Sequence, residues 1–301
     1  MVMRNEVTAR VPAKVNLQLS VGPLRADGYH ELVSVFHAVN VCDDVRATRA
    51  DGISLTIAGE GEDTLPRDES NLAWRAAVLL ADASGVDADV ALHIEKSIPI
   101  AGGMAGGSAD AAGALLACDA LWNLQTPREE LMEFAAELGS DVPFALHGGT
   151  AIGTGRGEFL TAVLSNGAFH WVFALADGGL STPLVYAECD RLRAGHDIPD
   201  PQVSDSLMQA LRAGDAMLLA EALHNDLQAP AIKLRPALAQ VLEVGEDYGA
   251  LGGVVSGSGP TCAFLVRDDE HALDVAVALT ASGVCRNVKR ATGPAPGARL
   301  I

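Results

Sequence analysis

Apolar and polar residues alternate along the first part of the chain, over residues 7–11 and again over residues 15–21. A period of two residues predicts β-strands that bury one face. Pro12 stands between the two runs. Because proline has no N–H to donate to a sheet, we expect it to separate two strands.

The opposite face of the second run carries Lys14, Asn16, Gln18 and Ser20. A polar strand face is ordinarily solvated, and this is the expected state of Gln18 and Ser20. For Lys14, which follows a strand-breaking Pro12, a functional role and a solvated one fit the sequence equally well. Lys14 and Asn16 point the same way in either case, because they lie two residues apart.

The rest of the chain shows helical and strand patterns in mixed order. Helices are expected to begin at residues 71 and 108 and to span residues 128–138, 206–211, 216–223, 236–248 and 269–280. Strands are expected at residues 32–41, 44–48, 53–58, 90–95, 169–175, 252–255, 262–266 and 286–291, with 44–48 paired to 53–58. Residues 177–186 and 195–204 are expected to be loops, and residues 293–301 a loose tail. The pattern favours an α+β fold, and 301 residues favour two domains, 1–165 and 166–301.

Four glycines, Gly102, Gly103, Gly106 and Gly107, lie within six positions directly before an alanine-rich helical stretch. Glycine has no side chain to bury, so such a loop suits close approach of the backbone to a ligand. Free amides at the start of the following helix favour an anion such as phosphate. The loop is not a P-loop, because Ser108 stands where that motif has lysine, and its paired glycines do not match a Rossmann loop. A loop used only for tight helix packing is the alternative.

Asp141 stands between a helix that Gly139 is expected to end and the sequence Val142-Pro143. It is a suitable N-cap for a following helix. A carboxylate at the mouth of a phosphate pocket is equally suited to accept a hydroxyl proton.

Tyr29 and His30 follow a glycine turn and together offer a flat ring and a ring nitrogen to a planar heterocycle. On the residues alone, a half-buried tyrosine beside a surface histidine is the simpler interpretation.

The net charge of −18 argues against nucleic acid or an anionic membrane as a partner. Five widely spaced cysteines without a C-x-x-C pair indicate neither a disulfide framework nor a zinc site, and they fit a reducing cytoplasm. No apolar run is long enough to span a bilayer, and residues 1–10 lack the apolar core of a signal peptide.

Three segments resemble, in order, the three motifs of the GHMP small-molecule kinases: residues 12–17 (PAKVNL), 99–109 (PIAGGMAGGSA) and 255–261 (VSGSGPT). Four further segments resemble those members of the family whose substrate carries a cytidine diphosphate group: residues 27–32 (DGYHEL), 139–144 (GSDVPF), 153–158 (GTGRGE) and 224–227 (HNDL). The resemblance covers nearly the whole chain. It implies an N-terminal α+β domain like ribosomal protein S5 domain 2 and a ferredoxin-like C-terminal domain.

The resemblance implies transfer of phosphate from ATP, with Mg²⁺, to the 2-hydroxyl of the small molecule 4-diphosphocytidyl-2-C-methyl-D-erythritol. Lys14 and Asp141 match the catalytic pair, with Asp141 taking the hydroxyl proton and Lys14 keeping that carboxylate ionised. The implied cofactor-binding residues are Asn71, Lys96, Pro99, Ile100, Ala101, Gly102, Gly103, Met104, Ala105, Gly106, Gly107, Ser108 and Ala109. The implied substrate-binding residues are Asn16, Tyr29, His30, Thr182 and Tyr186. A cytoplasmic monomer or homodimer without a protein-held metal is expected.

The glycine loop departs from the family pattern in four places. Ser108 is the sole serine at the helix entrance, Ala101 and Ala105 replace glycines, and Met104 stands where leucine is frequent. The single serine leaves the coordination of Mg²⁺ open.

Two alternatives remain at this point. A GHMP kinase acting on another alcohol, such as homoserine or mevalonate, would not need Tyr29, His30 and Tyr186. A nucleotide-binding sensor without turnover would be recognised by the loss of Lys14 or Asp141, and both are present.

Overall fold

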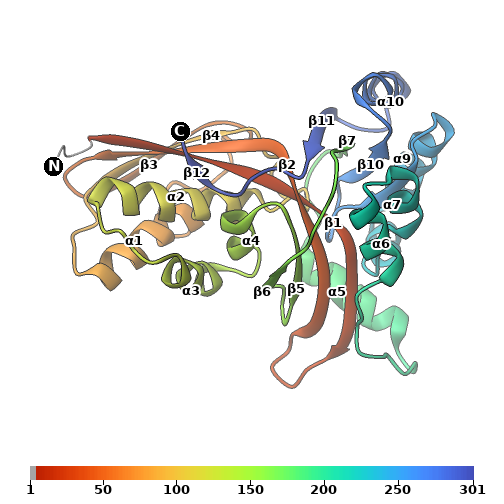
Figure 1. The fold of residues 1–301 in the computed structure, drawn as a ribbon, viewed down its shortest axis with the longest axis horizontal. Coiled ribbons are helices and arrows are strands. Elements are labelled where there is room, and N and C mark those ends of the chain that lie inside the picture. Colours follow the sequence, from red (N-terminus) through yellow and green to blue (C-terminus); the bar gives the residue numbers. More distant parts are fainter. Residues whose placement is uncertain (1–4) are drawn as a thin grey trace.

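The computed structural model describes residues 5–301, which form two β-sheets with helices packed against them (Figure 1). Residues 1–4, part of the segment considered above for a signal peptide, lie outside the described residues. Among residues 5–301, no helix is both long and apolar enough to cross a membrane. The five cysteines are free.

The first sheet has eight strands, and a long hairpin of β1 and β2 forms its centre. The strand order is β12-β1-β2-β4-β3, while β5 pairs with β2 and β6, and β8 pairs with β1. The expected pairing of residues 44–48 with 53–58 is wrong, because β4 lies between them, antiparallel to β2 and parallel to β3. The strands are β1 (Glu6–Leu24), β2 (His30–Arg49), β3 (Ile53–Gly59), β4 (Val90–Lys96), β5 (Thr150–Thr154), β6 (Phe159–Ala162), β8 (His224–Asn225) and β12 (Arg299–Leu300).

Strand β1 continues through Pro12, which was expected to divide it. The proline is accommodated by an irregularity instead, since the register with β2 shifts between Pro12 and Ala13 and again between Asn16 and Gln18. Such irregularities re-aim side chains and are common beside active sites. Here they flank Lys14 and Asn16.

Four helices lie along one face of the first sheet in Figure 1: α1 (Leu72–Ser84), α2 (Gly106–Trp122), α3 (Arg128–Leu138) and α4 (Val142–His147). Helix α2 is apolar nearly all round and packs between the sheet and the other three helices. Gly113 permits this close contact, because a Cβ there would lie 2.6 Å from Cγ2 of Val45 in β2. The start of α2 is thereby fixed relative to β1 and β2.

The second sheet has four antiparallel strands in the order β11-β7-β10-β9. This order, with helices between the first and second and between the third and fourth strands along the chain, confirms the ferredoxin-like arrangement. The strands are β7 (Phe169–Leu175), β9 (Gly252–Val255), β10 (Cys262–Val266) and β11 (Asn287–Gly293). The helices are α5 (Thr182–Arg193), α6 (Asp205–Ala213), α7 (Ala216–Ala222), α8 (Gln228–Leu234), α9 (Ala237–Asp247) and α10 (Asp269–Ser282).

Helices α5 and α8 were not predicted, and α5 includes Tyr186, which was expected in a loop. The start of α5 has a proline in its first turn, a position where proline is favoured. The signal was therefore present in Thr182-Pro183, but the helix buries only Val185 and Cys189, so its pattern of apolar residues does not mark a wide buried face.

The C-terminal segment is not loose, as had been expected, because it returns to the first sheet. Ala295 N donates to Ala38 O at 2.9 Å, and Ile301 N donates to Thr8 O at 3.0 Å, beside the β12–β1 pairing. One apolar core also contains residues of both halves, such as Val15 and Trp171. A boundary near residue 165 therefore stays a prediction.

Candidate active site

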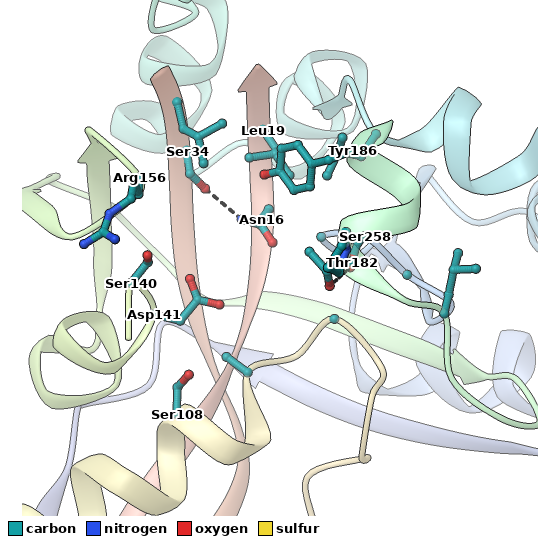
Figure 2. Close-up of a pocket in the computed structure, with 18 of the residues that line it drawn as sticks. Asn16, Leu19, Ser34, Ser108, Ser140, Asp141, Arg156, Thr182, Tyr186 and Ser258 are labelled. Atoms are coloured by element: carbon teal, nitrogen blue, oxygen red, sulfur yellow. Dashed lines mark hydrogen bonds between the residues drawn. The ribbon is translucent and has the colours of Figure 1, made fainter. Parts of the chain in front are cut away.

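A cavity of about 920 Å³ is lined by elements from both halves of the chain. Strands β1 and β2 with the loop that joins them, the glycine loop before α2, the start of α4 and the β5–β6 turn supply one part of the lining. Helix α5 with the residues before it, the residue before α8 and the loop after β9 supply the rest. Figure 2 shows Asp141 and Thr182 on opposite sides of Asn16. Segments far apart in the sequence thus converge on one space.

Lys14 and Asn16 project into this cavity from the irregular part of β1. Lys14 Nζ donates to Asn16 Oδ1 at 2.6 Å, and Asn16 Nδ2 donates to Ser34 Oγ at 2.7 Å (Figure 2). The Lys14 side chain is only 7% exposed, so its ammonium is held in one place by polar partners. Gln18 is also buried, contrary to expectation, and its side chain hydrogen-bonds Ser20, Gln202 and Ser204 instead of water.

Asp141 precedes α4, yet its side chain makes no capping hydrogen bond. Its Oδ2 lies 3.7 Å from Lys14 Nζ, within ion-pair range but beyond a hydrogen bond, and its side chain is 32% exposed. The cap interpretation of this carboxylate is therefore wrong. The Asp141 carboxylate is left accessible to a ligand beside a fixed ammonium.

The glycine loop approaches the cavity with its backbone. Ala101 and Ala105 adopt left-handed conformations, with φ of 49° and 61°, although each carries a Cβ. Helix α2 begins at Gly106, and Ala105 provides no side-chain cap, so the first amides of the helix keep their donors free for an anion. The loop residues that line the cavity are Pro99, Ala101, Gly102, Gly103, Ala105, Gly106, Gly107 and Ser108.

Five of the residues expected to bind the nucleotide do not line the cavity: Asn71, Lys96, Ile100, Met104 and Ala109. Met104 and Ala109 are buried in the apolar core. Asn71 caps α1, accepting from Ala73 N and donating to Pro66 O.

Lys96 is 1% exposed and lies between two buried carboxylates. Its Nζ is 2.6 Å from Asp43 Oδ2 and 2.7 Å from Asp110 Oδ2. Burial alone would lower the pKa of Lys96, but the two carboxylates outweigh it and raise that pKa. Asp43 also accepts from the backbone amides of Ser97 and Ile98. The cluster therefore ties the start of the glycine loop to α2, and in this conformation Lys96 does not face a ligand.

The other end of the cavity is aromatic. Tyr186 of α5 stacks on His30, with ring centroids 5.3 Å apart, and Tyr29 lies beneath the guanidinium of Arg156, whose Cζ is 5.1 Å from the ring centroid. His30 is buried, so its interpretation as a surface histidine is wrong, whereas Tyr29 is 53% exposed and thus half-buried, as that interpretation expected. Burial, with a contribution from the Asp141 charge, raises the pKa of Tyr186, so its hydroxyl keeps its proton.

Thr182 lies near this end, where its Oγ1 is 2.7 Å from Ser258 Oγ. The contact joins the start of α5 to the loop after β9. Thr182 and Ser258 both line the cavity. All five residues expected to bind the substrate therefore face one space.

Several lining residues received no site role from the sequence, among them Ser34, Arg156, Asp190 and Gly257. Ser34 could have been found as the single hydroxyl within an apolar run of β2. Arg156 and Gly257 belonged to recognised motifs. Asp190 stands in a charged helix face, and nothing in the sequence marks it. Among residues 5–301, no three metal-ligating side chains come together.

Comparison with known proteins agrees with this geometry. The model of the N-terminal domain of GHMP kinases matches residues 71–149, and the model of their C-terminal domain matches residues 207–285. A 4-diphosphocytidyl-2-C-methyl-D-erythritol kinase of Mycobacterium bovis is 58% identical over 295 residues, covering 98% of this chain and 93% of the relative.

Solved structures show that kinases acting on different alcohols can share this fold. A crystal structure of 4-(cytidine 5'-diphospho)-2C-methyl-D-erythritol kinase has a TM-score of 0.76 at 34% identity, covering 94% of this chain and 98% of its own. A homoserine kinase from Cytophaga hutchinsonii has a TM-score of 0.77 at 18% identity, covering 100% of this chain and 99% of its own, and it shares the fold alone. The fold is thus common to different alcohol kinases, whereas sequence identity distinguishes among them. The chain belongs to the GHMP kinases, in the group of the 4-diphosphocytidyl-2-C-methyl-D-erythritol kinases.

Proposed function

We propose that this protein transfers the γ-phosphoryl group of ATP to the 2-hydroxyl of 4-diphosphocytidyl-2-C-methyl-D-erythritol. The observation that carries the proposal is the uncapped carboxylate of Asp141, 3.7 Å from the ammonium of Lys14, in a cavity with a glycine loop at one end and stacked rings at the other. The activity named for close relatives supports the same substrate.

Asp141 accepts the proton of the acceptor hydroxyl as that oxygen forms a bond to the γ-phosphorus. The bond from phosphorus to the bridging oxygen of ADP breaks in the same displacement, and ADP leaves with that oxygen. A carboxylate is an intrinsically weak base, so proton acceptance by Asp141 supplies only part of the acceleration. Most of the acceleration therefore comes from alignment and from the positive charge of Lys14 beside the transferring group.

The glycine loop binds the phosphates of ATP through its backbone amides and the start of α2. The donor set of the cavity fits Mg²⁺, since this ion commonly takes one or two protein oxygens and fills its other positions with phosphate and water. Ser108 would hold it, and the bound ion would neutralise phosphate charge. Lys96 stabilises the glycine loop indirectly, through its ion pairs with Asp43 and Asp110.

The aromatic end binds cytidine, with the pyrimidine between Tyr29 and Tyr186 and its edge against His30. Tyr186 and His30 are already stacked, and Tyr29 is exposed enough to close over a ring. Asn16 and Thr182 orient the part of the substrate that joins cytidine to the reacting hydroxyl. We further propose that the protein is a cytoplasmic monomer or homodimer, and that the boundary between its two domains lies near residue 165.

Release of ADP tests the function directly. The enzyme is supplied with ATP, Mg²⁺ and one of three alcohols: the cytidyl substrate, homoserine or mevalonate. The variants are Asp141→Asn, which removes the base, and Asp274→Asn, an exposed aspartate on α10, as the matched control.

We expect turnover with the cytidyl substrate alone, unchanged in Asp274→Asn and reduced about 10²- to 10⁴-fold in Asp141→Asn. Turnover with homoserine or mevalonate would support kinase activity but contradict the cytidine site. ATP binding without turnover of any of the three alcohols would indicate a nucleotide sensor and not an enzyme.

A further inference from the structure

A carboxylate that belongs to none of the family-like motifs contacts the histidine of the aromatic end. Asp190 lies on α5, one turn after Tyr186, and its Oδ1 is 2.8 Å from His30 Nε2. The His30 side chain is 7% exposed and that of Asp190 is 43% exposed. His30 is thus held from two sides of its ring, by the carboxylate at Nε2 and by the stacked Tyr186.

The contact decides which ring nitrogen carries the proton. A neutral imidazole has one N–H donor and one bare nitrogen, and an ionised carboxylate can only accept. His30 Nε2 therefore carries the hydrogen and donates it to Asp190, which leaves Nδ1 as an acceptor. Among residues 5–301, no group hydrogen-bonds Nδ1 of His30. This atom is also not one of the buried side-chain nitrogen and oxygen atoms that lack a partner, so it is accessible from the cavity that His30 lines.

A bare ring nitrogen distinguishes the two common pyrimidines. Cytosine carries an amino group at C4, which donates a hydrogen bond, whereas uracil carries a carbonyl oxygen at C4, which only accepts. An acceptor facing that position pairs with cytosine and leaves two acceptors opposed when uracil is bound. A site built to hydrogen-bond one such group rejects an analogue that lacks it far better than an apolar pocket does.

We propose that Asp190 is a specificity-determining positioning residue, which fixes the tautomer and ring orientation of His30 so that Nδ1 accepts from the amino group of cytosine. Asp190 acts through His30 and does not itself read the base. The inference rests on the proposed function, since it requires that the aromatic end holds the cytidine of the substrate.

Binding of cytidine 5'-diphosphate and uridine 5'-diphosphate tests it by titration calorimetry. A saturating non-hydrolysable ATP analogue with Mg²⁺ occupies the phosphate loop, and pH 8 keeps an ordinary imidazole neutral, because its pKa is about 6.5. The variants are Asp190→Asn, whose amide can satisfy either tautomer, and Asp190→Ala, which satisfies neither. Glu188→Gln is the matched control, because Glu188 lies on the same helix but pairs with Arg191 and does not line the cavity.

We expect the wild type and Glu188→Gln to prefer the cytidine nucleotide, and the ratio of the two affinities to fall about tenfold in Asp190→Ala, the worth of one hydrogen bond, and by a smaller factor in Asp190→Asn, whose amide still permits the productive tautomer. The affinity for the cytidine nucleotide is expected to fall, while the affinity for the uridine nucleotide stays the same or rises. An equal loss of affinity for both nucleotides would show that Asp190 has a merely structural role and would overturn the inference. An unchanged ratio in the variants would overturn it as well, with the proposed function intact. A wild type without preference for cytidine would overturn the cytidine site and this inference with it.

Discussion

The carbonyl oxygen of Ser256 occupies the space that a side chain on Gly103 would need. A Cβ at Gly103 would lie 1.9 Å from that oxygen, and Ser256 Oγ donates to Gly103 O at 3.0 Å. Gly103 also has a φ of 73°, which disfavours any other residue. The two glycine-rich loops, one from each half of the chain, therefore meet backbone to backbone beside the cavity.

Gly103→Ala is expected to lower the free energy of unfolding by about 2–4 kcal/mol, because the new methyl group forces the loops apart and strains the backbone. Gly107→Ala is the matched control for stability, since its Cβ would meet nothing nearer than 3.7 Å. Denaturant unfolding of both variants measures the difference. Equal losses in the two would show that the contact between the loops is not rigid.

Asn225 stabilises the loop that borders Lys14. Its Nδ2 donates to the carbonyls of Val255 and Gly257, both at 2.7 Å, and its Oδ1 accepts from Leu227 N at 2.8 Å. A Cβ on Gly257 would lie 3.3 Å from Lys14 Nζ, so a shift of this loop moves the surroundings of the ammonium.

Asn225→Ala leaves three buried backbone groups without partners, and we expect kcat to fall at least about tenfold. His224→Gln, in the same short strand but exposed, should retain wild-type kcat. Steady-state kinetics with the cytidyl substrate measures kcat of both variants. A wild-type kcat in Asn225→Ala would show that the active conformation of this loop does not depend on its hydrogen bonds to the Asn225 side chain.

Lys96 is expected to matter for stability more than for contact with ATP. Lys96→Met leaves the carboxylates of Asp43 and Asp110 buried without their cation, and we expect a loss of about 3–5 kcal/mol in the free energy of unfolding. Adding Asp110→Asn should recover part of this loss, because one of the two carboxylates is then neutral. The exposed Lys233→Met should stay within about 0.5 kcal/mol of the wild type. A stable Lys96→Met with weakened ATP binding would restore the nucleotide role expected from the family.

His37 gives the fold a dependence on pH. It is fully buried where Gly293 packs against β2, and burial lowers its pKa to about 4, against about 6.5 in the unfolded chain. The unfolded state therefore binds more protons between these values. Its contribution to stability is complete above pH 6.5 and is lost as the pH falls toward 4.

We expect the unfolding free energy of the wild type to fall by about 1.4 kcal/mol per pH unit more than that of His37→Gln across this window. His37→Gln is less stable at pH 8 because its packing is changed, but its pH slope is flatter. Denaturant unfolding at intervals between pH 4 and 7 gives both slopes, with the exposed His196→Gln as control. Parallel slopes in wild type and His37→Gln would mean that water reaches His37 in the folded state.

The sequence by itself determined the local elements and the chemistry of the loop. Alternation marked β1, strand β7 and helix α3 have the bounds that were expected, and the paired glycines predicted a backbone that approaches an anion. These features depend on neighbours along the chain, whose periodicity and turn preferences are visible in the residues. The family resemblance then predicted Lys14, Asn16, Asp141, Thr182 and the aromatic residues, all of which line one cavity.

Tertiary structure decided which of these side chains are free to act. Asp141 and Lys96 are both charged residues beside helices or loops in the sequence, yet folding leaves the first accessible and seals the second between Asp43 and Asp110. Gln18 is buried and the C-terminal segment is paired because elements far along the chain cover them. Asp190 meets His30 across 160 positions. Burial and partner choice come from such long-range contacts, and no local pattern contains them.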